Sequence, residues 1–137
     1  MVNSVAFLGC GSWGAALSTI LSRKGVKINF WHRNPKIIES MTKSRKHYLL
    51  PSVKFVDSVR FFTDIEQAIT GIDTFVISVP SQHVREVISK LQIHIDSSKN
   101  IINIAKGIEN HTLMTMSQVI NDVIGDSIKI VTLSGPS

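Results

Sequence analysis

Short apolar runs alternate along the chain with longer stretches in which apolar residues recur at helical spacing. The apolar runs are strand-length and lie at residues 5–8, 27–31, 59–62, 74–79, 100–105 and 128–133. Runs of this kind are typical of strands that are buried on both faces, especially where glycine or proline stops them. They predict the strands of a mainly parallel sheet.

The stretches between these runs predict helices at residues 15–22, 34–43, 63–71, 81–91 and 114–124. Asn34 precedes Pro35, which suits an N-cap followed by proline at the first helical position. Thr63 and Glu66 have the spacing of a capping box. Ser81 follows the proline that stops a strand, and we expect it to cap the next helix.

Alternating strands and helices predict βαβ units, and therefore a Rossmann-type doubly wound α/β fold with helices on both faces of the sheet. Residues 45–57 fit neither pattern and are expected to be irregular. No repeat, low-complexity tract or linker divides the 137 residues, so we expect one domain with a single core.

Composition places the chain among ordinary globular proteins, with 43% hydrophobic and 18% charged residues. The net charge of +5 suits either a phosphorylated ligand or a basic surface. Nucleic-acid binding is not expected, because no arginine run or aromatic-interleaved basic stripe occurs. The apolar runs fall short of the ~20 residues that span a membrane, and residues 1–4 do not begin a signal peptide. We therefore expect a cytoplasmic protein with no membrane span.

Cysteine and histidine usage predicts neither a disulfide nor a metal site. Cys10 is the only cysteine, which fits a reducing compartment. We interpret it as a small residue in a tight loop rather than a nucleophile, because no His or Asp partner is adjacent. His32, His47, His94 and His111 share no metal-ligand spacing with Cys10 or with one another.

A glycine-rich loop, Gly9-Cys10-Gly11-Ser12-Trp13-Gly14, joins the first strand to the first helix. In this context GxGxxG predicts a dinucleotide site whose pyrophosphate meets backbone N–H groups and the helix dipole. Gly9 allows the tight turn, Gly11 allows close approach of the backbone to the pyrophosphate, and Gly14 allows the helix to pack on the strand. The loop lacks the Gly-Lys-Ser/Thr ending of nucleotide triphosphatases. The alternative is a glycine-rich turn that binds no ligand.

The end of the second strand bears on the choice of cofactor. Sites for NAD usually place Asp or Glu there, to bind the ribose 2′-hydroxyl. This chain has Phe30-Trp31-His32-Arg33-Asn34 instead, with no carboxylate. Arg33 can pair with a 2′-phosphate and stack on adenine, which favours NADP over NAD. The alternative is a solvated arginine beside a helix cap.

Lys106 follows the predicted strand at residues 101–105, at the edge of the sheet where open α/β folds bind ligands. A lysine there can hold a phosphate or polarise a carbonyl oxygen as hydride arrives. The alternative is an exposed loop lysine. Pro80 ends another strand at the same edge, where we favour an N-cap role for Ser81 over ligand contact and a surface position for His83.

Five motifs together resemble a known family. They are the loop at 9–14, Trp31-His32-Arg33-Asn34-Pro35, Val79-Pro80-Ser81, Ala105-Lys106-Gly107-Ile108-Glu109 and Leu133-Ser134-Gly135-Pro136-Ser137. Their order and spacing resemble the bacterial NAD(P)-dependent sn-glycerol-3-phosphate dehydrogenases over the whole chain. That family interconverts glycerol 3-phosphate and dihydroxyacetone phosphate, a small phosphorylated substrate, by hydride transfer for phospholipid synthesis.

The resemblance implies roles for particular residues. Substrate contacts would come from Lys106, Gly135 and Ser137, and Lys106 would also reach the nicotinamide side. Tyr48 is a looser match, because Tyr48-Leu49-Leu50-Pro51 has one residue more than the usual Tyr-Leu-Pro. The implied cofactor contacts are Gly9, Gly11, Ser12, Trp13, Gly14, Arg33, Tyr48, Pro80 and Lys106.

One departure from the family concerns length. Family members continue past Ser-Gly-Pro-Ser into a helical substrate domain that supplies a second lysine as proton acceptor, whereas this sequence stops at Ser137. We therefore expect residues 1–137 to be the NAD(P)-binding domain alone, without efficient turnover, and a homo-oligomer is compatible with the sequence. The alternatives are a free-standing dinucleotide-binding or sensor module without catalysis, and another reductase built on the same cofactor domain.

Overall fold

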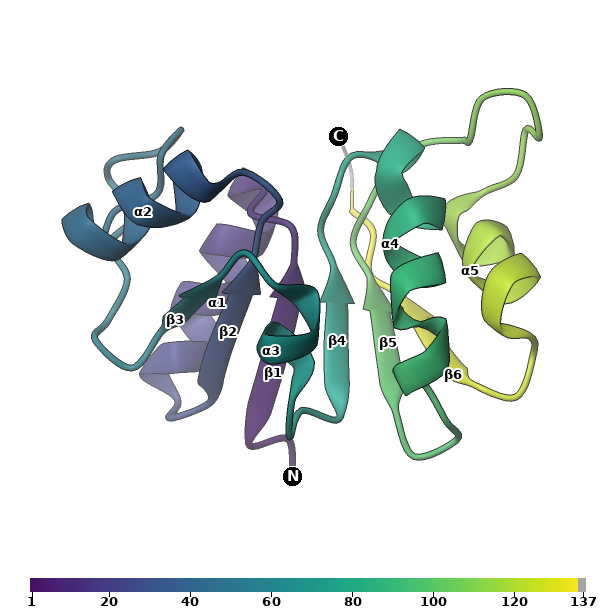
Figure 1. The fold of residues 1–137 in the computed structure, drawn as a ribbon, viewed down its shortest axis with the longest axis horizontal. Helices are drawn as coiled ribbons and strands as arrows, with labels where there is room; N and C mark the ends of the chain where they lie inside the picture. The colour runs from purple at the N-terminus through teal and green to yellow at the C-terminus, as the bar shows by residue number, and fades with distance from the viewer. Residues whose placement is uncertain (136–137) are drawn as a thin grey trace.

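The computed structural model describes residues 1–135 and contains one six-stranded sheet in the order β3-β2-β1-β4-β5-β6. All five neighbouring pairs are parallel, so the sheet is fully rather than mainly parallel. Figure 1 shows the six strands side by side, with β1 in the middle of the sheet between β2 and β4. The strands are β1 Ser4–Leu8, β2 Lys27–Trp31, β3 Arg60–Phe62, β4 Thr74–Ile77, β5 Asn100–Asn103 and β6 Lys129–Thr132.

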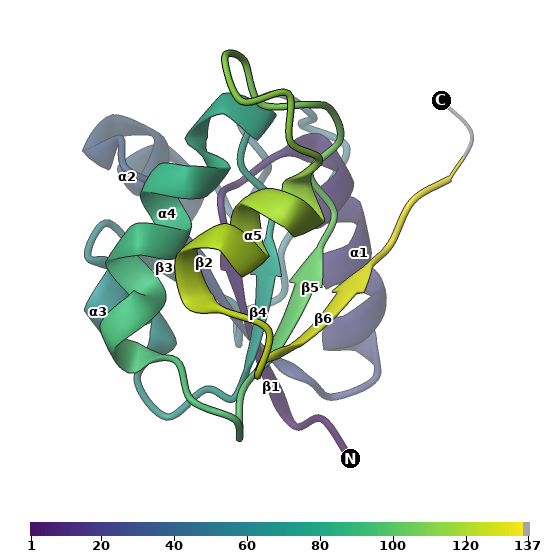
Figure 2. The same cartoon turned by 90° about the vertical axis from the view of Figure 1, so that its right-hand side faces the viewer.

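Helices cover both faces of the sheet, as the alternating pattern predicts. In Figure 2, α1 lies on one side of the sheet and α3, α4 and α5 lie on the other. The helices are α1 Ser12–Arg23, α2 Pro35–Ser44, α3 Ile65–Ile69, α4 Val84–Leu91 and α5 Met116–Ile124, with short 3₁₀ turns η1 Ser81–His83 and η2 Gln92–His94.

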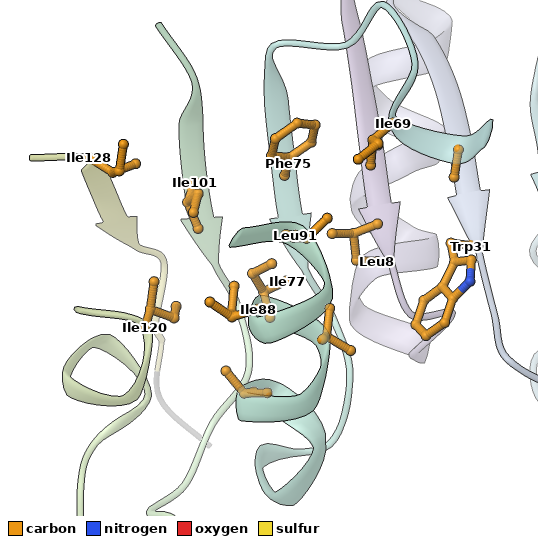
Figure 3. Packing of buried hydrophobic residues seen from close by; sticks show 14 of the residues in the cluster. Leu8, Trp31, Ile69, Phe75, Ile77, Ile88, Leu91, Ile101, Ile120 and Ile128 are labelled. Carbon is orange, nitrogen blue, oxygen red and sulfur yellow. The ribbon is translucent and has the colours of Figure 1, made fainter. Parts of the chain in front are cut away.

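Strands β1 to β5 each contribute side chains to two separate cores, because successive residues point to opposite faces, whereas β6 contributes only Ile130, to one of them. In β1, Ala6 and Leu8 join the core under α3, α4 and α5, whereas Val5 and Phe7 join the core under α1 and α2. Figure 3 shows the first of these cores, which includes Leu8, Trp31, Phe75, Ile77, Ile88, Leu91 and Ile101. Burial on both faces explains why the strands are apolar runs rather than alternating ones.

The order of the strands positions the site. The chain leaves β1 toward β2 on one side and returns later to β4 on the other, so the direction of winding reverses between β1 and β4. Leu8 at the end of β1 is in register with both Trp31 of β2 and Ile77 of β4, so the three carboxyl ends lie level. Crevices for ligands form at such a reversal, beyond the carboxyl ends of the strands.

Two of the predicted helix caps are wrong. Asp64, not Thr63, caps α3, and its side chain accepts from the N–H groups of Glu66 and Gln67. Ser81 makes no capping hydrogen bond, and the chain there forms the 3₁₀ turn η1 before α4 begins at Val84. The Asn34 cap of α2 is confirmed, since its side chain accepts from Lys36 N–H. Neighbouring oxygen-bearing side chains compete for a cap, and the turn that leads into the helix decides between them.

Candidate functional site

A cleft of about 820 Å³ opens at the carboxyl ends of β1, β2, β4 and β5. This volume lies toward the upper end of the roughly 300–1,000 Å³ typical of ligand pockets. Its walls are the loop at 9–14, the segment after β2, part of the irregular segment 45–57, the start of α4 and the residues after β5. The lining residues are Gly9, Cys10, Gly11, Ser12, Trp13, Trp31, His32, Arg33, Asn34, Tyr48, Leu49, Ser78, Val79, Pro80, His83, Glu86, Val87, Ile104, Ala105 and Lys106.

The structure brings most of the predicted site residues together in this cleft. Those that line it are Gly9, Gly11, Ser12, Trp13, Arg33, Tyr48, Pro80 and Lys106. Gly14 does not line it and packs beneath the loop instead. The carbonyl of Gly135 accepts a hydrogen bond from Lys106 Nζ at 3.4 Å. Ser137 lies outside the described residues.

Gly9 makes the turn out of β1 in a conformation that favours glycine, with φ of +107°. Its N–H donates to Trp31 O at 2.9 Å, which continues the pairing of β1 with β2 into the loop. A Cβ at this position would lie 2.5 Å from Ser78 O and 2.6 Å from Ser78 C. The loop therefore crosses the end of β4 too closely for any side chain at residue 9.

The other two glycines also face Ser78. A Cβ on Gly14 would collide with Ser78 Oγ and would lie 3.3 Å from Phe7 Cδ1, which fits the predicted close packing of helix on strand. A Cβ on Gly11 would lie 3.3 Å from Ser78 O. The steric constraint seen at Gly11 is thus contact with β4, in addition to any approach of a ligand from the cleft.

The first turn of α1 has backbone N–H groups without an acceptor inside the helix, and two of its residues, Ser12 and Trp13, line the cleft. The helix begins at Ser12 after Gly11, which has no side-chain cap, and its first internal bond runs from Ala15 N–H to Gly11 O at 2.9 Å. The N–H groups of Ser12, Trp13 and Gly14 consequently have no acceptor within the helix. Free N–H groups at a helix N-terminus attract anions such as phosphate.

Positive charge gathers at both ends of the cleft. Arg33 follows β2 and Lys106 follows β5, whereas Glu86 is the only carboxylate among the lining residues. Glu86 binds Lys90 Nζ at 2.9 Å, and this hydrogen bond is the main reason its pKa is lowered. Burial, and secondarily the charge of Arg33, lowers the pKa of His32. The cleft therefore suits a ligand with phosphate groups.

The loop that carries Lys106 is fastened to the start of α4. Gly107 has φ of +122° and packs against Ser81. Gln82 Nε2 donates to Ile108 O at 2.9 Å, and Gln82 Oε1 accepts from Asn110 N–H at 2.9 Å. These contacts come from η1, so the turn where Ser81 was expected to act as a cap holds the Lys106 loop instead.

An ion-pair network adds a second fastening for the same loop. Arg85 of α4 donates to both carboxylate oxygens of Glu109, at 2.8 and 2.9 Å, and to Asp122 of α5 at 2.6 Å. The Arg85 hydrogen bonds are the main cause that lowers the pKa of Glu109 to about 2. Glu109 is the last residue of the Lys-Gly-Ile-Glu motif, so this motif ends in the residue that anchors it.

Sequence reasoning missed several residues of the site. Ser78 falls inside the predicted strand at residues 74–79, whereas β4 ends at Ile77. The strand-end signal that singles out Lys106 therefore does not mark Ser78. Glu86 lies one helical turn beyond His83 and could have been found by that spacing. His47 is buried and reaches the loop at 9–14 from 37 residues away. No pattern in the sequence indicates that contact.

The remaining chemistry of the described residues is limited. Cys10 is 2% exposed, and burial raises the pKa of its thiol, which opposes a role as nucleophile. Within residues 1–135, no group of three His, Cys, Asp or Glu side chains is arranged to hold a metal ion. No helix in that range is long and apolar enough to cross a membrane.

Comparisons with known proteins agree with the geometry. Residues 4–137 match the family described as NAD-dependent glycerol-3-phosphate dehydrogenase N-terminus. Proteins named glycerol-3-phosphate dehydrogenase [NAD(P)+] from Clostridium tetani (strain Massachusetts / E88) and Clostridium perfringens (strain SM101 / Type A) are 35% and 37% identical to the chain over 99% of its length. The chain spans only 39% and 41% of those two proteins. A crystal structure of glycerol-3-phosphate dehydrogenase from Coxiella burnetii has a TM-score of 0.89 and 27% identity, covering 98% of this chain and 41% of that one.

Proposed function

The chain belongs to the NAD-dependent glycerol-3-phosphate dehydrogenase family, and we propose that it is the cofactor-binding domain of an enzyme that interconverts sn-glycerol 3-phosphate and dihydroxyacetone phosphate with NAD(P)H. One observation carries the proposal. A single cleft brings together the glycine loop after β1, Arg33 after β2 and Lys106 after β5. The first two suit the pyrophosphate and adenosine of a dinucleotide, and the third suits a small phosphorylated substrate.

The residues of the cleft fit a nicotinamide dinucleotide. Gly9 and Gly11 lie so close to Ser78, just after β4, that neither position has room for a Cβ at ordinary contact distance. The loop therefore lies close against the end of the sheet. The unused N–H groups of Ser12 and Trp13, which line the cleft, would hold the pyrophosphate. Tyr48 and Pro80 would contact the cofactor from the sides. When bound, the cofactor supplies or accepts the hydride.

Lys106 would act at the junction of cofactor and substrate. Lys106 lines the cleft, and its ammonium group donates to Gly135 O at 3.4 Å. From there it can attract the substrate phosphate or stabilise the charge that develops on the carbonyl oxygen. Gly135 and Ser137 would lie along the substrate. Proton transfer would come from a lysine in a C-terminal helical domain outside residues 1–137.

The reaction would supply the glycerol backbone of phospholipids, and it would take place in the cytoplasm. The 137-residue chain alone would bind cofactor but show negligible reduction of dihydroxyacetone phosphate. Steady-state turnover comparable with that of a full-length relative would contradict this division between the two domains.

Cofactor binding can be measured directly, because both tryptophans of the chain, Trp13 and Trp31, line the cleft. We expect NADPH and NADH to change tryptophan fluorescence, with tighter binding of NADPH. Arg33→Ala should lower the affinity for NADPH by about tenfold and the affinity for NADH by much less, because one charge-assisted hydrogen bond to the 2′-phosphate is lost. Arg23→Ala, which removes the same charge from the far end of α1, is the matched control.

Two outcomes would count against the proposal in different ways. If neither cofactor binds the wild-type chain, the proposed function is wrong. If both bind with equal affinity and Arg33→Ala changes neither, the dinucleotide site stands but the NADP preference does not.

A further inference from the structure

His47 is buried in the irregular segment 45–57, with 1% of its surface exposed, and both of its ring nitrogens have partners. Nε2 lies 2.7 Å from Cys10 O, in the middle of the glycine loop. Nδ1 accepts from the N–H groups of Leu49 and Leu50, at 3.2 and 3.1 Å. One imidazole thus joins two walls of the cleft that are far apart in the sequence.

These partners determine where the ring proton lies. Backbone N–H groups only donate, so Nδ1 must carry its lone pair toward Leu49 and Leu50. A carbonyl oxygen only accepts, so Nε2 must carry the proton and donate it to Cys10 O. The arrangement satisfies every polar group of a neutral imidazole with the proton on Nε2, and it leaves none of them buried without a partner.

The hydrogen bond to Cys10 O also orients the next N–H group. In a trans peptide, the C=O of one residue and the N–H of the next point in opposite directions from the same plane. Holding Cys10 O toward His47 therefore turns the Gly11 N–H away from His47. Throughout residues 1–135, the hydrogen bonds of the structure include no protein acceptor for Gly11 N–H, although Gly11 lines the cleft. Gly11 N–H is therefore available to donate to a ligand or to solvent in the cleft.

We propose that His47 is a positioning residue for cofactor binding, and that its Nε2–H fixes the Cys10–Gly11 peptide so that Gly11 N–H is presented to the cofactor pyrophosphate. The same ring holds the backbone of Leu49, which lines the cleft, and packs 4.9 Å from the ring of Tyr48. This inference rests on the proposed function, because it assigns a role toward the dinucleotide.

A matched set of substitutions can separate the two sides of the ring. His47→Gln places an amide N–H where Nε2–H lies, so it can still donate to Cys10 O but loses the acceptor toward Leu49 and Leu50. His47→Asn has the opposite effect, since its shorter side chain can accept from those N–H groups but cannot reach Cys10 O. His47→Phe loses both bonds and keeps an aromatic ring. His111→Asn, at an exposed position, is the control for the same exchange elsewhere.

Affinity for NADPH, measured by tryptophan fluorescence, is the main readout. His47→Gln should bind within about threefold of the wild type, and His47→Asn and His47→Phe should bind about tenfold or more weakly, since a buried carbonyl then lacks its donor. Urea unfolding of each variant shows whether affinity and stability change together. Equal affinity of His47→Asn and wild type would overturn the inference, as would equal losses in His47→Asn and His47→Gln.

A second measurement needs no variant. Nitrogen-15 NMR of the wild-type chain should show His47 with its proton on Nε2, and addition of NADPH should shift the Gly11 amide signal. A proton on Nδ1, or a Gly11 signal that bound cofactor leaves in place, would overturn the inference even if the variants fail to fold. If the wild type binds no dinucleotide at all, the proposed function itself is wrong and the inference falls with it.

Discussion

The two loops that face each other across the cleft are held by different kinds of interaction. The glycine loop is fastened by contact with Ser78 and by the neutral side chain of His47. The Lys106 loop is fastened by the side chain of Gln82 and by the ion pairs of Arg85 with Glu109 and Asp122. One wall of the cleft therefore depends on close packing and buried hydrogen bonds, and the other on polar groups near the surface.

This difference has consequences for how each wall responds to a change. An added atom in a closely packed region lowers the stability of the fold strongly, whereas salt has little effect on such packing. Surface ion pairs tolerate small steric changes, are screened by salt and depend on pH. We expect the cofactor side of the cleft to be rigid and the substrate side to be adjustable.

The largest expected effect comes from adding a methyl group to a glycine in each wall and comparing the two losses of stability. Gly9→Ala would place a Cβ 2.5 Å from the backbone oxygen of Ser78, whereas Gly107→Ala would place one 3.1 Å from Ser81 Oγ and 3.2 Å from Ser81 Cβ, so that the Ser81 side chain need shift only slightly. Both positions have positive φ, at +107° and +122°. We expect Gly9→Ala to lower the free energy of unfolding by about 3–5 kcal/mol and Gly107→Ala by about 1–2 kcal/mol. Urea unfolding measures both, and equal losses would contradict the comparison.

The next effect concerns charge and pH. The pKa of Glu109 is lowered from 4.5 to about 2, mainly by Arg85, so its ion pair stabilises the fold fully above pH 4.5. That stabilisation is lost as the pH falls through about 2, because the carboxylate is then protonated in both folded and unfolded states. Thermal unfolding of wild type and Glu109→Gln should therefore differ at neutral pH and converge toward pH 2.

Salt dependence and amide hydrogen exchange show whether the effect of Glu109→Gln is confined to the Lys106 loop. High salt should reduce the difference between wild type and Glu109→Gln. Exchange at Leu113 N–H, which donates to Glu109 O, should become faster in Glu109→Gln, and exchange at Gly9 N–H should not change. Faster exchange at both amides would mean that the two walls are not independent.

The smallest effect is expected from Gln82→Ala. This change removes the hydrogen bonds to Ile108 O and from Asn110 N–H, both at exposed positions. We expect a loss of about 0.5–1 kcal/mol in the free energy of unfolding and faster exchange at Asn110 N–H. Unchanged exchange at Asn110 would show that Gln82 does not fasten the Lys106 loop.

Much of the fold can be predicted from the sequence because its physical causes are local. Strands buried on both faces must be apolar, so β1, β2 and β4 stand out as short runs. The glycine loop stands out because only glycine tolerates the turn at Gly9 and the contact at Gly14. Arg33 and Lys106 can be located because ligands collect at strand ends in this fold.

The parts that could not be predicted depend on contacts between distant segments. Asp64 rather than Thr63 caps α3, and Trp31 Nε1 donates to the backbone oxygen of Thr63 at 2.9 Å, a contact that spans 32 residues. Ser81 packs on Gly107 rather than capping a helix. Nothing in the sequence around His47 distinguishes it from an ordinary loop residue. Its contact with Cys10 O forms only when the segment 45–57 folds against the glycine loop.

Ser78 lies under all three glycines of the loop, and this limits the order in which substitutions can accumulate during evolution. Alanine at position 14 collides with the Ser78 side chain, so a prior Ser78→Gly change would relieve that conflict. Alanine at position 9 meets the backbone oxygen of residue 78, which no replacement of that side chain removes. We therefore expect alanine at position 14 to be accepted only after the change at position 78 has occurred. Glycine at position 9 is expected to stay fixed whatever side chain residue 78 carries.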